Sequence, residues 1–182
     1  MEKYLGNKNI AVFISGRGSN LKSLINHSKK KNSLIKIILV ISNNPDAKGL
    51  KYASKSKIKI YGIKNKSNFE NNSIKLLKKF NIDILCLAGF MKILSGNFIK
   101  KFSKPILNIH PSLLPKYKGL NTHERAIKNK EKFAGASIHK VTEKLDSGKV
   151  ILQKKVRILK SDNVISLEKK VLKIEHEIYP KA

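Results

Sequence analysis

The chain of 182 residues is poor in cysteine, in aspartate and in long apolar runs. Its single cysteine, Cys86, excludes an intramolecular disulfide framework, and its place in the apolar run 84–87 indicates a buried thiol rather than a nucleophile. The apolar runs all fall short of the roughly 20 residues that a membrane-spanning helix needs. The first residues lack the apolar segment of a signal peptide. We therefore expect a protein of the cytoplasm without a membrane partner.

Acidic residues are scarce, and arginine is scarcer still. The chain carries 39 lysine and arginine residues against 12 acidic residues, a formal net charge of +27, but its arginines are only Arg17, Arg125 and Arg157. Such a charge attracts polyanions, yet proteins that read bases usually use arginine. The lysines are also spread over every segment of the chain. We therefore expect a preference for anionic small substrates and no specific nucleic-acid binding.

What the sequence does contain is an alternation of short apolar runs and amphipathic segments. Strands are expected at 9–15, 35–42, 58–63, 82–90, 106–109, 134–141 and 150–158, where apolar and β-branched residues cluster. Helices are expected from Leu21, from an Asp46 cap through Ser54, and over 68–80, 95–102, 122–130 and 163–178. The sequence shows neither an internal repeat nor a linker. This order predicts a single α/β domain over 1–182, doubly wound and Rossmann-like, with about seven mostly parallel strands and helices on both faces.

A glycine-rich loop, Gly16-Arg-Gly-Ser-Asn20, follows the first expected strand and precedes a helix. Such a loop can point backbone N–H groups at a phosphate. By itself it is equally consistent with a tight turn in which Ser19 caps the helix. The loop lacks the third glycine of a dinucleotide fingerprint and the Gly-Lys-Ser/Thr of a P-loop. A nucleotide cofactor is therefore not expected.

The most informative segment is 106–119, Ile-Leu-Asn-Ile-His-Pro-Ser-Leu-Leu-Pro-Lys-Tyr-Lys-Gly. An apolar strand delivers Asn108 and His110 to its carboxyl end, where open α/β sheets bind ligands. Asn108 offers an amide donor, and His110 titrates near neutral pH. A lone pair of this kind is more often incidental, and Asp146, before Ser147-Gly148, is by itself more often a turn residue. Without further information, the apolar segment 91–94 is expected to belong to the hydrophobic core. Glu175 is expected to be a solvated residue, because charged residues usually stay exposed.

Taken whole, the segment 106–119 closely resembles the signature of the folate-dependent formyltransferases, Asn-x-His-Pro-Ser-Leu-Leu-Pro-x-Tyr-x-Gly. Further similarity at 14–21, 87–94, 142–148 and 175–180 extends the resemblance from about Asn9 to Pro180. Within this family the chain is most similar to the branch that acts on 5-phosphoribosylglycinamide in de novo purine biosynthesis. The resemblance implies transfer of a formyl group from 10-formyltetrahydrofolate, as co-substrate, to the amine of that ribonucleotide, without a metal.

The resemblance also assigns roles to individual residues. The catalytic residues would be Asn108, which donates to the oxyanion, His110, which stabilises that charge and moves the proton, and Asp146, which orients His110. The ribonucleotide would contact Gly18, Ser19, Asn20 and Glu175. The folate would contact Lys66, Met91, Lys92, Ile93, Leu94 and Asn108. Lys66 and Lys92 stand where many relatives carry arginine.

The sequence leaves several hypotheses about function open. Within the family, the chain could be the catalytic domain of a methionyl-tRNA formyltransferase, which the positive charge suits, although there is no room for a C-terminal tRNA-binding domain. A formyltetrahydrofolate hydrolase would carry an N-terminal regulatory domain, and only eight residues precede the first strand. From another class comes a non-enzymatic basic RNA-binding module. Relatives continue beyond Ala182 with an apolar stretch and a hairpin, and either a monomer or a homodimer is expected.

Overall fold

The computed structural model describes residues 7–65 and 67–182, so the predicted folate ligand Lys66 lies outside the described residues. The described residues contain seven strands and six α-helices, followed by one short 3₁₀ helix. The chain divides into two compact units, one reaching to Ile106 and the other spanning Leu107–Ala182.

The first unit is built on four parallel strands in the order β3-β2-β1-β4. These strands are β1 (Lys8–Ile14), β2 (Ile35–Ser42), β3 (Lys59–Gly62) and β4 (Ile84–Leu87). β1 is central, and its residues from Ile10 to Ile14 are at most 2% exposed. Burial of successive residues shows that both faces of β1 are covered, as in parallel sheets whose crossover helices lie on both sides.

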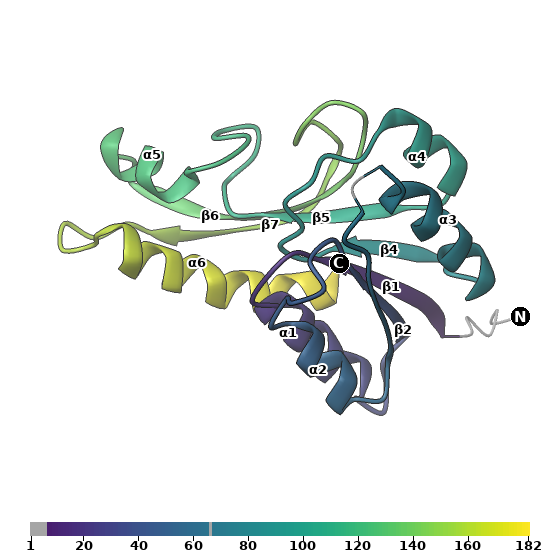
Figure 1. The fold of residues 1–182 in the computed structure, drawn as a ribbon. Coiled ribbons are helices and arrows are strands. Elements are labelled where there is room, and N and C mark those ends of the chain that lie inside the picture. Colours follow the sequence, from purple (N-terminus) through teal and green to yellow (C-terminus); the bar gives the residue numbers. More distant parts are fainter. Residues whose placement is uncertain (1–6, 66) are drawn as a thin grey trace, which may run out of the picture. The chain divides into compact units, whose positions relative to one another are not determined.

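Two pairs of helices cover the sheet of the first unit. α1 (Ser19–Ser28) and α2 (Leu50–Lys55) pack together on one face, and α3 (Phe69–Lys79) and α4 (Gly96–Phe102) pack together on the other (Figure 1). Phe13 of β1 meets the second pair, with its ring 5.5 Å from that of Phe69 and 6.0 Å from that of Phe98. Such tilted and edge-on aromatic contacts add to the stability gained by burial.

The second unit holds three strands in the order β5-β6-β7, with antiparallel pairing throughout. They are β5 (Ile106–His110), β6 (Phe133–Lys140) and β7 (Val150–Arg157). The unit also contains α5 (Thr122–Lys128), α6 (Val164–Ile178) and the 3₁₀ helix η1 (Tyr179–Lys181). α6, drawn in yellow, runs along β6 and β7 (Figure 1). Apolar residues spaced three and four apart predict a buried stripe on this helix. Leu167, Val171, Ile174 and Ile178 are buried as predicted, whereas Val164 at the start of the stripe is 40% exposed.

These elements confirm the predicted Rossmann-like α/β fold of seven strands, and two boundaries are corrected. β4 ends at Leu87, short of the predicted 90, because Gly89 at φ +69° turns the chain. Asp46 does not cap α2, whose N-cap is Gly49. Instead, the Asp46 N–H donates to the side chain of Asn44, which closes a local turn.

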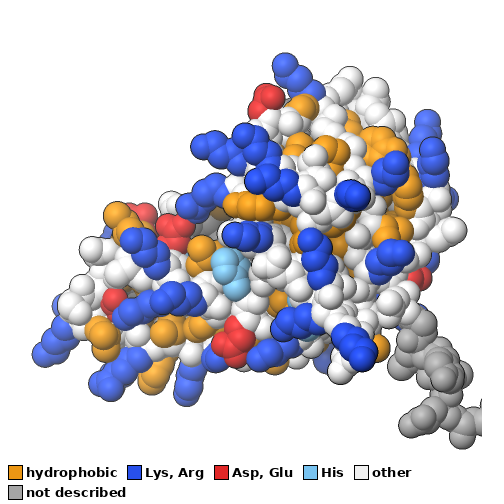
Figure 2. All heavy atoms as spheres, turned by 90° about the horizontal axis from the view of Figure 1, so that it is seen from below, with side chains coloured by type: hydrophobic (Ala, Val, Ile, Leu, Met, Phe, Trp, Pro, Cys, Tyr) orange, Lys and Arg blue, Asp and Glu red, His pale blue; other side chains and the backbone are white. Residues whose placement is uncertain are grey.

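Two surface properties bear on the expected partners. Within the described residues, no helix is at once long enough and apolar enough to cross a membrane. On the face shown in Figure 2, lysine and arginine side chains are scattered among apolar and neutral ones. Charge scattered in this way attracts anions without regard to sequence.

Candidate active site

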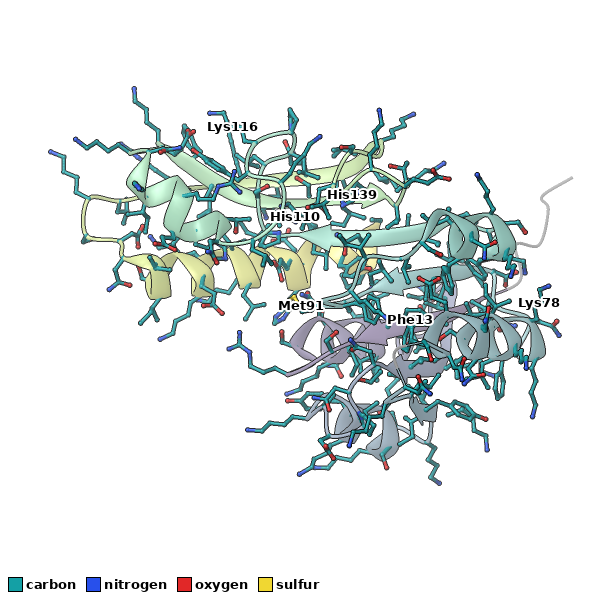
Figure 3. All side chains as sticks on the ribbon, turned by 45° about the horizontal axis from the view of Figure 1, so that its top comes forward. Phe13, Lys78, Met91, His110, Lys116 and His139 are labelled. Atoms are coloured by element: carbon teal, nitrogen blue, oxygen red, sulfur yellow. The ribbon has the colours of Figure 1, made fainter. Side chains whose placement is uncertain are left out.

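The pairing of β5 with β6 places four polar side chains on one face of the second unit. Asn108 lies opposite His139, and His110 lies opposite Ser137. Because residues two apart on a strand point to the same side, and paired residues share a face, all four side chains are brought together. Figure 3 labels His110 and His139, which project from these two neighbouring strands. The sequence predicts two of these residues and misses the other two.

His110 is 5% exposed and makes polar contacts through both ring nitrogens. Its Nε2 lies 2.9 Å from the carbonyl oxygen of Tyr117. Its Nδ1 lies 3.4 Å from Oδ2 of Asp146. A backbone carbonyl can only accept, so Nε2 carries the hydrogen that it donates. In the neutral ring, Nδ1 then holds the lone pair and faces the carboxylate.

Asp146 reaches this face from the turn after β6. It is 8% exposed, and its backbone is in the left-handed region at φ +45°, as turn residues of this kind tolerate. Its Oδ2 accepts from the backbone N–H of Gly119 at 2.9 Å, and its Oδ1 lies 3.4 Å from Nε2 of His139. Asp146 is thus both a turn residue and a member of the buried polar network. A turn residue with that double position cannot be recognised from composition alone.

His139 connects the remaining members, and the sequence gives no motif for it. Its Nδ1 lies 3.0 Å from the carbonyl oxygen of Lys140, so Nδ1 donates there. Its Nε2 lies 3.1 Å from the side-chain nitrogen of Asn108 and accepts from that amide. The signal that could have found His139 is its place two residues after Ser137 in an otherwise apolar strand.

The charges of this network follow from burial and hydrogen bonding. Burial lowers the pKa of His110, and this outweighs the opposite effects of the Tyr117 carbonyl and the Asp146 carboxylate. Burial would raise the pKa of Asp146, but the contact with His139, the hydrogen bond from the Gly119 N–H and the nearby His110 together bring it below its ordinary value. At neutral pH the carboxylate is therefore ionised while His110 is mainly neutral and able to accept a proton.

In the first unit, the loop 16–20 forms a tight turn at the end of β1. Gly18 is the N-cap of α1 and lies at φ +74°, and a Cβ there would meet Cα of Gly49 at 2.5 Å. Ser19 is the first helical residue and makes no side-chain cap bond among the described contacts, so the alternative of Ser19 as helix cap is wrong. The backbone N–H groups of Ser19 and Asn20 belong to the first turn, where no intrahelical acceptor exists for them.

The other predicted ligand contacts differ in exposure. Met91 and Ile93 are 73% and 67% exposed, whereas Leu94 is 4% exposed. The Lys92 ammonium lies 5.5 Å from the ring centre of Phe69, and the Met91 N–H donates to the Ser15 hydroxyl at 2.8 Å. Exposed apolar side chains at the end of a strand are typical of a wall that a flat ligand covers. In the second unit, Glu175 is 7% exposed and so is not the solvated residue that its charge alone suggests.

Metal chemistry was not expected from the sequence. Among the described residues, no group of three or more histidine, cysteine, aspartate or glutamate side chains is arranged to hold a metal ion. His110, His139 and Asp146 are instead joined by contacts to one another and to the backbone.

Comparison with known proteins adds a family to this geometry. The family model for formyl transferases matches residues 8–182. A phosphoribosylglycinamide formyltransferase of Haemophilus influenzae is 41% identical over 179 residues, which cover 95% of this chain and 84% of that protein. The trifunctional purine biosynthetic protein adenosine-3 of Homo sapiens is 43% identical over 180 residues, which cover 95% of this chain. The chain spans only 18% of the length of that human protein.

Solved structures show the same similarity. The crystal structure of phosphoribosylglycinamide formyltransferase from Anaplasma phagocytophilum matches with a TM-score of 0.90 and 40% identity, covering 98% of this chain and 84% of that chain. Glycinamide ribonucleotide transformylase 1 from Symbiobacterium toebii matches with a TM-score of 0.92 and 33% identity, covering 98% of this chain and 86% of that chain.

Proposed function

Because this chain belongs to the formyl transferase family, as its sequence predicts, we propose that it transfers the formyl group of 10-formyltetrahydrofolate to the amine of 5-phosphoribosylglycinamide. The observation that carries the proposal is the polar network of the second unit, in which half-buried Asn108 is joined through His139 to the buried pair of His110 and Asp146. The match to a phosphoribosylglycinamide formyltransferase over 84% of its length supports the choice of substrate. The proposal treats 1–182 as one formyltransferase domain, of which the family model matches 8–182.

Formyl transfer begins when the amine attacks the formyl carbon and a tetrahedral oxyanion forms. The Asn108 amide has two N–H groups, and one of them is bound to His139. That hydrogen bond fixes which way the amide points and leaves the second N–H to donate to the oxyanion. One such donor is typically worth about 3 kcal/mol of barrier.

The attacking amine must lose a proton, and the leaving nitrogen of the folate must gain one. Nδ1 of His110 holds the lone pair in the neutral ring, so it is the nitrogen that takes up a proton. The ionised Asp146 carboxylate, 3.4 Å away, stabilises the imidazolium that results. The lowered pKa of His110 suits a group that must be neutral before it accepts a proton and must release that proton again.

We assign the ligand contacts as the family resemblance implies. The ribonucleotide would bind Gly18, Ser19, Asn20 and Glu175, and the folate would bind Lys66, Met91, Lys92, Ile93, Leu94 and Asn108. The tight approach of Gly18 to Gly49 and the exposure of Met91 and Ile93 support these assignments. A cytoplasmic location and a monomeric or homodimeric state stay predictions.

The proposal is tested by spectrophotometric formyl transfer with 10-formyltetrahydrofolate, with and without the ribonucleotide. His110→Ala should lower kcat by about a hundredfold to ten-thousandfold, the usual range for loss of a proton-transfer group. His27→Ala, at a half-buried histidine on α1, is the matched control and should keep full activity. Circular dichroism should show that both variants are folded.

Three outcomes would contradict the proposal. Release of formate without the ribonucleotide would indicate a hydrolase. Transfer to methionyl-tRNA in preference to the ribonucleotide would indicate the tRNA-directed branch of the family. Salt-sensitive RNA binding that survives His110→Ala, in a folded protein without turnover, would indicate a basic binding module.

A further inference from the structure

The backbone of Tyr117 is held in a conformation that bulky residues rarely adopt. Its φ is +55°, in the left-handed region. Gly119 at φ +77° and Asn121 at φ +57° follow in the same loop, and glycine and asparagine tolerate that region. An aromatic residue does not tolerate it easily, and such residues persist only where the surrounding structure holds them.

The side chains of Arg125, Asn129 and Glu131 hold Tyr117 in place. We call these four residues the Tyr117 clamp. The Tyr117 hydroxyl donates to Oε1 of Glu131 at 2.8 Å and accepts from the side-chain nitrogen of Asn129 at 3.0 Å. The guanidinium carbon of Arg125 lies 5.0 Å from the ring centre of Tyr117. Arg125 also donates to the carbonyl oxygen of Lys118 at 2.7 Å, which fixes the next peptide. The clamp therefore controls both the side chain and the backbone of the loop.

The backbone that the clamp fixes is the backbone that binds the catalytic pair. The Tyr117 carbonyl accepts from Nε2 of His110 at 2.9 Å, and the Gly119 N–H donates to Oδ2 of Asp146 at 2.9 Å. Only Lys118 lies between the two residues that make these contacts. A rotation of this short segment would therefore disturb His110 and Asp146 together.

We propose that Tyr117 is a positioning residue that sets the tautomer of His110. The proposal rests on the function above only for its effect on catalysis. With the Tyr117 carbonyl in place, Nε2 keeps its hydrogen and Nδ1 presents its lone pair beside Asp146. Without that carbonyl, the carboxylate of Asp146 would attract the hydrogen to Nδ1, because a carboxylate is the stronger acceptor. The ring would then offer its lone pair from the other nitrogen.

The titratable and charged groups around His110 are Asp146, His139, Arg125 and His123. Asp146 favours a hydrogen on Nδ1, and the Tyr117 carbonyl opposes it by holding the hydrogen on Nε2. By holding the Tyr117 carbonyl in place, the clamp thus favours the tautomer with hydrogen on Nε2 over the tautomer with hydrogen on Nδ1.

The clamp can be weakened without emptying a core. Tyr117, Lys116 and Glu131 line a groove of about 610 Å³ together with His123, Ala126 and Phe133. Tyr117 is half-buried, so a partner that loses its hydroxyl can be hydrated from the groove. Variants at the clamp should therefore fold.

The test uses ¹⁵N-labelled histidine in the full chain, with the ring signals of His110 identified by their loss in His110→Ala. The wild type should show hydrogen on Nε2 of His110 near neutral pH. Tyr117→Phe, which keeps the ring and removes the hydroxyl, should shift the population toward hydrogen on Nδ1. Glu131→Ala should do the same, whereas Glu131→Gln keeps an acceptor for the hydroxyl and should match the wild type. Hydrogen on Nδ1 in the wild type, or an unchanged tautomer in Tyr117→Phe, would overturn the proposal.

This measurement needs no turnover, so it separates failure of the proposal from failure of the proposed function. Where formyl transfer is measurable, Tyr117→Phe should lower kcat about tenfold to a hundredfold, the range expected for misplaced reacting groups. The KM for the ribonucleotide should stay unchanged, and the acid limb of the pH profile of kcat should move. A merely structural role would lower the stability to urea and leave both the tautomer and the pH profile as in the wild type.

Discussion

The strands β1 and β5 both end at a segment to which the proposed function assigns a ligand or a reaction, but the two ends are built differently. After β1, the loop 16–20 offers backbone groups, and its tightest constraint is a glycine, Gly18, pressed against another glycine, Gly49. After β5, the site is a network of side chains, most of them buried, and the main chain supports it by accepting a hydrogen bond from His110 and donating one to Asp146. One end depends on the shape of the backbone and the other on the chemistry of side chains.

The difference indicates how each end should respond to mutation. A backbone that points N–H groups at an anion is indifferent to most side chains but intolerant of a Cβ where two backbones touch. A network of hydrogen-bonded side chains responds in the opposite way, because each deletion leaves a buried partner unsatisfied.

The largest expected effect comes from removing a side chain at the end of β5. Asn108→Ala should lower kcat by about a hundredfold to a thousandfold, equivalent to about 3–4 kcal/mol of barrier, because it deletes a donor to the oxyanion. Ser19→Ala, at the end of β1, is the matched deletion and should change the KM for the ribonucleotide less than tenfold, because the backbone N–H remains. Steady-state kinetics checks both. Equal losses in the two variants would show that the two ends do not differ as described.

A methyl group added at the end of β1 should have the next largest effect. Gly18→Ala places a Cβ 2.5 Å from Cα of Gly49 and forces alanine to φ +74°. We expect the free energy of unfolding to fall by about 2–3 kcal/mol, together with a raised KM for the ribonucleotide. Gly16→Ala is the control, since a Cβ there meets nothing within 4 Å. If urea unfolding shows Gly16→Ala to be less stable than Gly18→Ala, the contact between the backbones of Gly18 and Gly49 is not the main constraint on this loop.

The same contrast explains what the sequence could predict. Strand and helix positions follow from local periodicity, and most predicted elements agree with the structure to within a few residues. The predicted start of the last helix at Asn163 agrees as well, because Asn163 forms a capping box with Ser166. The sequence shows Gly18 as a residue of a tight turn. It does not show that Gly49, 31 positions later in the chain, lies against Gly18.

The residues that the sequence misses depend on long-range geometry. His139 enters the network only because the antiparallel register places it opposite Asn108. Tyr117 matters through its carbonyl oxygen, which no side-chain pattern reports. The signature identifies Asn108 and His110 as candidate catalytic residues, and the family pattern adds Asp146. Neither shows that a histidine and a strained loop complete the network, because periodicity does not fix strand register or the path of a loop.

A smaller effect is expected where β5 is held from the C-terminal side of the second unit. The Tyr179 hydroxyl donates to the carbonyl oxygen of Leu107 at 3.0 Å, and Tyr179 is 3% exposed. Tyr179→Phe leaves that buried carbonyl without this donor and should lower the free energy of unfolding by about 1–2 kcal/mol. Tyr61→Phe, at a half-buried position in β3, should change it by less than about 0.5 kcal/mol. If Tyr179→Phe lowers kcat before it lowers stability, this hydrogen bond positions Asn108 and His110 and does more than anchor β5.

The smallest effect concerns acid stability, and it separates the active network from its surroundings. Hydrogen bonds from Lys170, the Leu159 N–H and Ser166 lower the pKa of Asp162 to about 2. Since the folded state favours the ionised carboxylate, its contribution to stability is present above the ordinary aspartate pKa of 3.8 and is lost as the pH falls from about 4 toward 2. Asp146 also has a lowered pKa, so part of the acid loss should come from the network itself. Asp162→Asn should therefore flatten the pH dependence of urea unfolding below about pH 4 only in part. A completely flat profile would place all of the acid sensitivity at Asp162, whereas an unchanged profile would place it at the other carboxylates whose pKa is lowered, Asp146, Glu131 and Glu177.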